Sequence, residues 1–500
     1  MGYFPAILGF LIASAALANA DLRAGAATTD WPTAARTDIL AAYDIYRSNH
    51  PGMHDPNNPG FAVQLERARD AGLTYAARAR DRFGYQRALG AFSTEMQDGH
   101  AQLTLNAPIK DTPPSQYLSP GFAAAWRGNR LLIHSTQDFP LPVGTVIEGC
   151  DGLAAADLAK SMLVSQNFRW REDGDWWLKT PRIFRAGVGE DRPNACTFLA
   201  PDGSRSTMTL EWKRAPADLG ERLTRATDGE RTPIGLWELR KGLLIIGLPS
   251  FEPDGEERRA YDALYEAMTN HKEALWSARA VVIDLRHNGG GSSSWGDRVA
   301  DALWGEDAVG RKMAAYFKHV SIWWRASEGN TRYVGKLAED FRRQGDKEAA
   351  AWADVLRSGM EVAMARNEPF HVEADESDTP AKEETGETGF DRPVYVITPG
   401  GCRSACLDAV DIFKQFANVK LIGAPTSGDT PYMDIRSEVL PSGEGKIVIP
   451  NKLWMFKPRK PNEIYRPDIE VTDLDWSTAV FLEHIEKDLA SGSPQPSPKP

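Results

Sequence analysis

The chain has 500 residues, of which 42% are hydrophobic and 25% are charged, and its formal net charge at pH 7 is −11. This length exceeds the size of one usual hydrophobic core, so we expect two or three structural units in an ordinary soluble globular protein. The acidic balance argues against a nucleic-acid-binding groove and gives no sign of a basic patch for a membrane surface.

The first twenty residues differ from the rest of the chain. An apolar run from Ala6 to Leu17 leads into Ala18-Asn19-Ala20, the small-residue pattern of a signal-peptide cleavage site. No Lys or Arg precedes the run, but it is shorter than the about 20 residues that an uncleaved membrane anchor needs. We therefore predict a cleavable signal peptide at residues 1–20. The mature protein would be periplasmic or secreted, with no stable membrane span.

Residues 21–112 are predicted to form a helical N-terminal part. Apolar residues recur at steps of three and four in three stretches, residues 37–46, 61–80 and 83–96. The last stretch runs into Asp98-Gly99-His100, and the alternating residues after it predict a strand. His100 is therefore expected at a helix-to-strand turn, where a histidine considered alone is more often a structural hydrogen-bonding residue than a catalytic one.

Residues 113–213 predict a β-rich insertion. Short strands separated by turns are expected at residues 121–126, 130–134, 144–149 and 207–212. The Trp-rich segment from Phe168 to Trp177 could face a bound peptide or belong to the hydrophobic core, and we expect the core.

Residues 230–475 predict a core in which strands alternate with helices. A hairpin is expected from residues 236–239 and 243–247, and the following elements are expected at 258–276 (helix), 280–285 (strand), 295–303 (helix), 394–398 (strand), 435–440 (strand) and 446–449 (strand). Strand, helix and strand joined by short links are typical of β-α-β units and a mainly parallel sheet. The fold class predicted here is α/β, with α+β character from the attached parts.

Two segments are set apart from this core. Residues 306–390 form an insertion, with a polar helix expected from Tyr333 to Met364 and an acidic run from Glu373 to Glu387. We interpret the acidic run as a solvated loop, and nothing in its residues requires that it act as a lid. The Pro- and Ser-rich end, residues 488–500, is expected to be disordered.

Four cysteines in an exported protein permit disulfides without requiring them. Cys150 and Cys196 fall in the same predicted unit and could pair. Cys402 and Cys406 could also form a bridge, but we expect them to be small buried thiols. Their spacings do not match a zinc site.

Two glycine-rich turns each follow an apolar strand and precede a helix. The first is Asp284 to Gly291 (DLRHNGGG), and the second is Pro399 to Cys406 (PGGCRSAC). Adjacent glycines permit positive φ angles and a close approach of backbone amides, which at a helix start can bind an anion. Ser404 lies at such a helix start. Considered alone it would be an N-cap residue, and the first turn alone could be a plain β-turn-α loop.

These motifs together resemble those of peptidase family S41, the tail-specific and tricorn-like serine peptidases. The first turn resembles the family's signature loop, and Ser404-Ala405 resembles its serine-alanine pair. Gly423 to Gly428 (GAPTSG) and Asp98-Gly99-His100 match two further motifs in the right order. The resemblance covers roughly residues 30–112 and 230–475. It implies a ClpP/crotonase-like β-α-β core, and Val143 to Gly152 resembles the strand and turn of the PDZ-like domains that such proteins often insert.

The resemblance implies Ser404 as the nucleophile, and the sequence departs from the family at the base. Tail-specific members use a lysine after the Pro-Thr turn, where this chain has Asp429 and no lysine between Lys420 and Lys446. An aspartate cannot serve as the neutral amine of a Ser-Lys pair, so this mechanism is excluded. The tricorn-like branch uses a histidine, which His100 matches. An imidazole titrates near neutral pH and can accept and return a proton.

The remaining site residues are also implied by the resemblance. Glu463 is placed near the orienting glutamate of the tricorn-like branch, with Asp98 and Asp468 as alternatives. Gly290 and Ala405 are expected to supply the amides of an oxyanion hole. His287, next to the glycines, occupies a position that the family leaves variable, and we expect it on the loop surface.

We therefore predict an exported serine-type endopeptidase that acts on peptide or protein substrates without a cofactor or metal. A catalytically inactive peptide-binding protein and an esterase on the same fold are the alternatives. Histidines at 50 and 54 are separated by Pro51-Gly52 and do not form a helical zinc motif. Substrate specificity and oligomeric state do not follow from the sequence.

Overall fold

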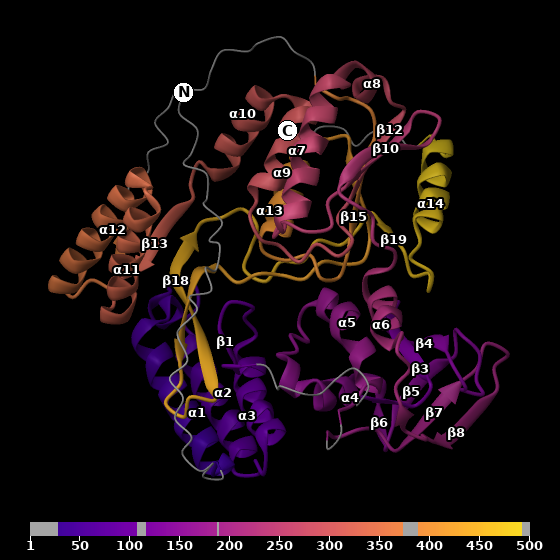
Figure 1. Cartoon of the computed structure of the whole chain (residues 1–500), viewed down its shortest axis with the longest axis horizontal. Helices are drawn as coiled ribbons and strands as arrows, with labels where there is room; N and C mark the ends of the chain where they lie inside the picture. Colours follow the sequence, from indigo (N-terminus) through magenta and orange to yellow (C-terminus); the bar gives the residue numbers. More distant parts are fainter. Residues whose placement is uncertain (1–28, 108–116, 188–189, 374–388, 493–500) are drawn as a thin grey trace.

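The computed structural model describes residues 29–107, 117–187, 190–373 and 389–492. The predicted signal peptide, the acidic run beyond Glu373 and the last eight residues of the predicted tail lie outside them. Figure 1 shows an α/β core at the top, the N-terminal helices at lower left, a β-rich unit at lower right and a helical hairpin at the left. The predicted fold class is confirmed.

The core is a six-stranded sheet in the order β10-β11-β12-β15-β16-β19. Its strands are β10 (Gly235–Arg240), β11 (Leu243–Gly247), β12 (Ala280–Asp284), β15 (Val394–Thr398), β16 (Val419–Gly423) and β19 (Ile469–Glu470). β10 and β11 form the expected antiparallel hairpin, and every pairing from β11 to β19 is parallel. All five residues of β12 and of β15 are buried, as expected for strands covered on both faces.

Helices cover one face of this sheet (Figure 1), namely α7 (Gly255–Asn270), α8 (Lys272–Ser277), α9 (Ser294–Trp304), α10 (Glu306–Phe317) and α13 (Ala405–Phe413). The opposite face carries α14 (Thr478–Ala490) and apolar residues of the β-rich unit, all within one hydrophobic cluster. Asp254 begins α7 with a capping box that involves Glu257, which explains the sharp start of this helix.

The N-terminal part consists of α1 (Trp31–Asn49), a 3-10 turn (Pro51–His54), α2 (Phe61–Ala76) and α3 (Arg82–Met96). It is joined to the core by a second sheet, which contains β1 (Gln102–Leu105), β13 (Ser321–Arg325), β14 (Phe370–Val372), β17 (Tyr432–Val439) and β18 (Gly445–Met455). β1 pairs antiparallel with β18, with Gln102 opposite Val448. This pairing holds the residues before β1, including His100, against the C-terminal third of the chain.

The β-rich unit is an antiparallel sheet in the order β3-β4-β5-β7-β8. Its elements are β3 (Phe122–Arg127), β4 (Arg130–Thr136), β5 (Val146–Cys150), β6 (Leu153–Ala154), β7 (Ala195–Leu199), β8 (Arg205–Thr209), α4 (Ala155–Met162), a 3-10 turn (Val164–Gln166), α5 (Asp173–Lys179), a 3-10 turn (Thr180–Phe184) and α6 (Leu219–Asp228), flanked by the short pair β2 (Leu118–Ser119) and β9 (Lys213–Arg214). Trp177 is buried, so the core assignment for the Trp-rich segment is confirmed. The strand β7 was not anticipated from the sequence.

Four local predictions are wrong. Residues 488–490, expected at the start of the disordered tail, are the last residues of α14. The polar helix expected over residues 333–364 is two helices, α11 (Glu328–Gln344) and α12 (Lys347–Ala365), because Gly345 adopts φ 82° and Asp346 caps the second helix. The helix expected over 258–276 is interrupted at His271. Cys402 and Cys406 are not thiols but form a disulfide.

The other cysteine pair, Cys150–Cys196, is also a disulfide, and it joins the neighbouring strands β5 and β7. Within the described residues, no helix is both long enough and apolar enough to cross a membrane.

Candidate active site

Three loops meet where neighbouring parallel strands end. β12 ends at Asp284, β15 at Thr398 and β16 at Gly423, and each is followed by one of the motifs found in the sequence. The carboxyl ends of parallel strands lie at the same edge of a sheet, which is where open α/β folds bind ligands. The topology therefore brings the glycine loop, the Ser404 loop and residues 424–430 together.

Buried polar contacts fix the glycine loop. Arg286 and Asp284 are fully buried and form an ion pair of 2.6 Å, and Arg286 also donates to the carbonyl of Trp476 at 2.6 Å. Asn288 donates to the carbonyl of Leu248 at 2.8 Å. The acidic, basic and amide side chains of the DLRHNGGG motif are thus structural, and they present the glycines at the edge of the sheet.

Ser404 has an unusual backbone conformation, with φ 53° and ψ −131°, directly before α13. A positive φ is uncommon for a residue other than glycine and is found preferentially at functional sites. Its amide donates to Oδ2 of Asp429 at 2.6 Å, and its carbonyl accepts the amides of Leu407 and Asp408. Since these bonds occupy the backbone, the geometry is that of a fixed serine, and no side-chain capping bond is formed to α13.

Gly290 contacts Ser404 more closely than any other residue type would allow. A Cβ added at Gly290 would lie 2.7 Å from the carbonyl oxygen of Arg403 and 3.0 Å from Cβ of Ser404, and φ at Gly290 is 107°. The amide of Gly290, however, donates to Oδ1 of Asn288 at 3.0 Å. The amide of Ala405 begins α13, where helix amides lack partners within the helix.

The Cys402–Cys406 disulfide encloses Ser404 between its two ends. The Cα atoms of the two cysteines are 5.3 Å apart, within the usual range for a disulfide. The turn between β15 and α13 brings them this close, which spacing in the sequence alone did not indicate. The bridge braces the segment that carries the serine.

His100 is half-buried in the turn between α3 and β1, and its amide donates to Oδ1 of Asp98 at 2.8 Å. Oδ1 of Asp98 also accepts from the hydroxyl of Thr430 at 2.9 Å. Thr430 follows Asp429, which binds the amide of Ser404. The Asp-Gly-His turn and the serine loop therefore contact neighbouring residues of one strand-to-strand loop. In the described part of the chain, Nδ1 of His100 is buried without a hydrogen-bond partner.

A second histidine, His50, lies close to Asp98. Nε2 of His50 lies 3.7 Å from Oδ2 of Asp98, and Nδ1 of His50 accepts the amide of Gly52, so the neutral ring carries its proton on the side facing Asp98. Burial alone would raise the pKa of Asp98, but the contact with His50 and the nearby His100 lower it below its usual value. Asp98 therefore remains a carboxylate that fixes the turn.

The two other candidate carboxylates differ in their surroundings. Glu463 is exposed, and its Oε2 accepts the amide of Lys460 at 2.7 Å. The preceding residue, Asn462, donates its amide to the carbonyl of Asp429 at 2.7 Å, so this turn also borders the loop at 428–430. Oδ2 of Asp468 instead accepts the amide of Leu421 in β16 at 2.7 Å, which gives it a structural role in the sheet.

The β-rich unit contributes charges to the same place. Arg169 is buried and donates to the carbonyl of Gly428 at 3.0 Å and to Glu172 at 3.0 Å, while Glu172 accepts the amide of Gly428 at 3.0 Å. Burial raises the pKa of Glu172 to about 7, against the opposing effect of Arg169. Gly428 is thus bonded on both sides by this unit.

Several of these supporting residues were missed from the sequence. Arg169, Glu172 and Thr430 act through contacts between segments that are far apart in the chain, and no local pattern marks them. Asp429 was noticed only as the residue that replaces a lysine. His287, expected on the surface, is half-buried, and burial lowers its pKa despite the nearby charge of Asp228.

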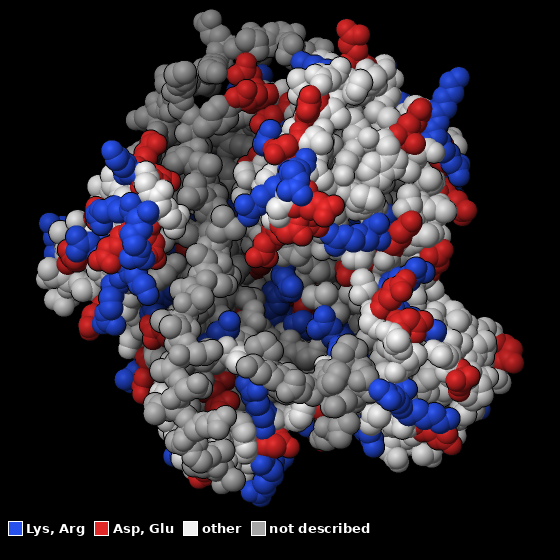
Figure 2. Space-filling view, viewed as in Figure 1, with Lys and Arg blue, Asp and Glu red and all other residues white. Residues whose placement is uncertain are grey.

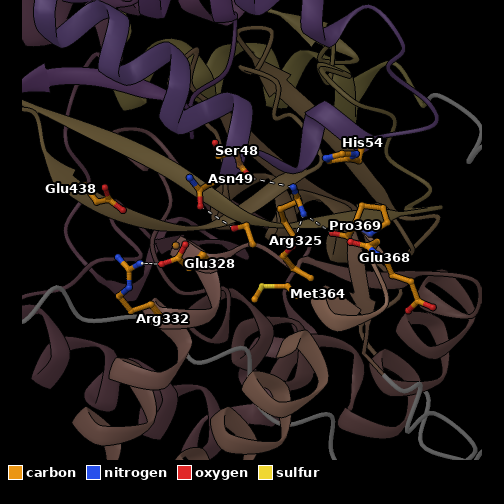
Figure 3. A pocket seen from close by; sticks show the side chains of 14 residues that line it. Ser48, Asn49, His54, Arg325, Glu328, Arg332, Met364, Glu368, Pro369 and Glu438 are labelled. Carbon is orange, nitrogen blue, oxygen red and sulfur yellow. Dashed lines mark hydrogen bonds and ion pairs between the residues drawn. The ribbon is translucent and has the colours of Figure 1, made fainter. Parts of the chain in front are cut away.

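A cavity of about 720 Å³ lies away from these loops, between the end of α1 and the α11–α12 hairpin (Figure 3). Arg325 lines this cavity, and its guanidinium donates to the carbonyls of Ser48 and Pro369. These hydrogen bonds connect the end of α1 to the segment after α12. Neither Ser404 nor His100 lines this cavity. No cluster of three or more potential metal ligands occurs among the described residues.

Comparison with known families decides the class of protein. Residues 242–470 match the model of peptidase family S41. This core belongs to peptidase family S41. The predicted resemblance to the family is confirmed for this core, which is accordingly that of a serine-type peptidase, a hydrolase. No curated protein sequence matches the chain significantly.

Solved structures with a similar fold include mature CPAF. The complex of mature CPAF with lactacystin aligns with a TM-score of 0.58 and 14% identity, over 93% of this chain and 100% of that chain. A second structure of mature CPAF aligns with a TM-score of 0.58 and 13% identity, over 93% of this chain and 99% of that chain. The photosystem II D1 C-terminal processing protease aligns with a TM-score of 0.36 and 14% identity, over 89% and 96%. At these identities the likeness to CPAF shows the shared fold alone.

Proposed function

We propose that this S41 protein is an exported endopeptidase that uses Ser404 as nucleophile and His100 as general base. The observation that supports this most is that the Ser404 loop and the Asp-Gly-His turn are both hydrogen-bonded to one short loop, at Asp429 and Thr430. The amide of Ser404 binds Asp429, and Thr430 binds the aspartate of the Asp-Gly-His turn. Two segments about three hundred residues apart thereby border the same edge of the sheet.

In the proposed reaction, Oγ of Ser404 attacks the carbonyl carbon of the scissile peptide bond while His100 takes the hydroxyl proton. The tetrahedral oxyanion then collapses, the C–N bond breaks, and His100 returns the proton to the leaving amine. Water, deprotonated by the same imidazole, hydrolyses the resulting ester and releases Ser404. His100 thus serves first as base and then as acid.

The Ala405 amide is proposed as one donor to the oxyanion. Gly290 remains the proposed second contributor, because its backbone is the part of the glycine loop nearest to Ser404. Its amide would have to exchange Asn288 for the oxyanion, since it donates to Asn288 in this structure. Removing one such donor typically lowers turnover by 10²–10³-fold.

Glu463 is proposed to orient His100. The turn that carries it borders Asp429, and its carboxylate has only one protein contact, to the amide of Lys460, among the described residues. Exchange of that contact for a nitrogen of His100 requires movement of an exposed side chain only. Asp98 and Asp468 are less suited because both bind backbone amides in the framework.

Export is supported by the two disulfides, which form and persist in oxidising compartments such as the periplasm or the extracellular medium. This supports the predicted signal peptide at residues 1–20. We also keep the PDZ-like interpretation of the β-rich unit as a proposal, since its antiparallel sheet has edge strands at which an extended peptide could be added.

Digestion of an unfolded protein such as casein tests this function. The mature chain should generate new peptides, identified by mass spectrometry, and Ser404→Ala should generate none. Hydrolysis of p-nitrophenyl acetate without any cleavage of casein would favour an esterase. Tight binding of peptides without hydrolysis of either substrate would favour the inactive peptide-binding protein.

A further inference from the structure

Arg403 is a cation without a partner directly next to the proposed nucleophile. Its side chain is half-buried, and within the described residues its guanidinium forms no hydrogen bond and no ion pair. A Cβ added at Gly289 would lie 3.9 Å from Nη2 of Arg403. The guanidinium therefore lies beside the glycine loop, next to Gly289.

The acidic side chains nearest to Arg403 already have other partners. Asp175 is bonded to Lys179 at 3.0 Å, Glu172 to Arg169 at 3.0 Å, and Asp429 to the amide of Ser404 at 2.6 Å. The shortest contact of each of these carboxylates is thus with a group other than Arg403. None of them neutralises Arg403 at close range.

One carboxylate, Asp228 at the end of α6, faces the same region without a direct bond. The charges that act on it are, from the largest effect to the smallest, those of His287, Arg127, Arg182 and Arg403, but it forms no ion pair with any of them in the described part of the chain. Burial raises the pKa of Asp228, which weakens it further as a counter-ion. Figure 2 shows blue side chains on the floor of the hollow between the core and the lower parts of the molecule.

We propose that Arg403 binds a carboxylate of the peptide substrate and so determines specificity. A guanidinium presents two parallel N–H donors that match the two oxygens of a carboxylate, and a partly buried one gains more from such a pair than an exposed one. The proposal rests on the proposed function, since it requires that the acylated peptide lie at Ser404. It adds the class of substrate, which that function leaves open.

The carboxylate could belong to an acidic side chain next to the scissile bond or to the C-terminus of the substrate. Both sources offer the same two oxygens to the guanidinium. They are separated by matched peptides, based on a sequence that the wild type cleaves in casein. One pair exchanges Glu for Gln on either side of the scissile bond, and the other exchanges a free C-terminus for an amide.

The test compares kcat/KM for these pairs in the wild type, in Arg403→Met and in Arg403→Glu. We expect the wild type to prefer the carboxylate member of one pair by about 10–100-fold, the usual range for a charge-assisted contact. The preference should fall to within about threefold in Arg403→Met and reverse toward Lys-containing peptides in Arg403→Glu. The rate of labelling by a small uncharged fluorophosphonate is also measured in each variant. Dividing kcat/KM by this rate corrects for any general loss of Ser404 reactivity.

Three results would overturn the inference. Equal cleavage of both members of each pair by the wild type would show that no carboxylate is recognised. Loss of the preference in Arg182→Met to the same extent as in Arg403→Met would assign it to the general charge of the hollow. Slower labelling of Arg403→Met with an unchanged preference would assign the guanidinium to the oxyanion instead. A wild type that cleaves no peptide and is not labelled would refute the proposed function itself.

Discussion

The two halves of the candidate site are built differently. On the nucleophile side, Asp284, Arg286 and Asn288 are all buried and bonded, Gly290 contacts Ser404, and a disulfide encloses the serine. On the base side, Nδ1 of His100 has no partner among the described residues, and Glu463 is exposed. The proposed nucleophile is thus held by fixed contacts, whereas the proposed base lacks, in the described part of the chain, a contact that would orient its ring.

This difference indicates where substrate can act on the protein. A serine held at a positive φ by buried bonds needs no rearrangement, because the fold maintains its geometry. In the proposed mechanism, the imidazole of His100 and the carboxylate of Glu463 would come into contact when a bound peptide covers them and excludes water. Catalytic hydrogen bonds are often incomplete before substrate binds. Changes on the two sides should therefore have different consequences.

The largest effect is expected from the glycine that contacts the serine. In Gly290→Ala, the new Cβ would lie 2.7 Å from the carbonyl of Arg403 and require a positive φ, so the loop must shift away from Ser404. Turnover of peptide substrates should fall by about 10³-fold or more. Gly289→Ala is the matched control, because its Cβ would meet only Arg403, at 3.9 Å. Similar activities for the two variants would contradict a close-fitting nucleophile side.

A change on the base side tests the missing contact. Glu463→Gln should lower kcat by about 10²-fold or more, because a neutral amide stabilises the imidazolium less than a carboxylate does. Asp468→Asn, which alters a carboxylate bonded to β16, should change kcat by less than about threefold and affect mainly thermal stability. If the second variant loses more turnover than the first, the orienting role belongs elsewhere.

The charges under the site should give a pH-dependent stability. The pKa of Glu172 is raised by burial to about 7 from an ordinary value of 4.5. Between these pH values the folded protein holds a proton that the unfolded chain has released. The free energy of unfolding should therefore decrease as pH rises through this window. The decrease amounts to roughly 3 kcal/mol, at about 1.4 kcal/mol for each pKa unit.

Glu172→Gln removes this titration. Urea unfolding of both proteins from pH 4.5 to pH 8 should give a difference in unfolding free energy that changes in favour of the Gln variant as pH rises. Parallel curves over the whole range would mean that the buried carboxyl is charged throughout.

A smaller effect is expected from the disulfide around Ser404. Replacing Cys402 and Cys406 with Ser should slow fluorophosphonate labelling by about 10-fold, because the serine segment loses its brace. The matched variant, with Cys150 and Cys196 replaced by Ser, removes a bridge within the β-rich unit and should leave the labelling rate within about twofold. Equal labelling rates in the two double variants would argue that the bridge only stabilises the fold.

The sequence was most informative about elements with a strong local pattern. The buried strands β12 and β15, the glycine turns and the start of α13 follow from apolar runs that end in glycine, and the motifs at these turns identified the family. Local pattern failed where a single residue determines the end of a helix, as at Gly345, whose positive φ ends α11. It also failed for the Cys402–Cys406 bridge, which depends on how the turn folds.

Contacts between distant segments could not be read from the sequence. The bond from Thr430 to Asp98 joins residues 332 positions apart, and Arg169 reaches Gly428 across 259 positions. These bonds exist because β1 pairs with β18 and because the β-rich unit shares a hydrophobic core with the main sheet. Ser404 and His100 were proposed from the motifs, whereas the residues that support them required the structure.

The most direct test of the account is whether Ser404 is activated by the distant imidazole. The mature protein is treated with a fluorophosphonate, and the modified residue is located by mass spectrometry in the wild type, in Ser404→Ala and in His100→Ala. We predict modification of Ser404 in the wild type, none in Ser404→Ala, and a rate at least about 10²-fold lower in His100→Ala. Labelling of His100→Ala at the wild-type rate, or no labelling of the folded wild type, would contradict it.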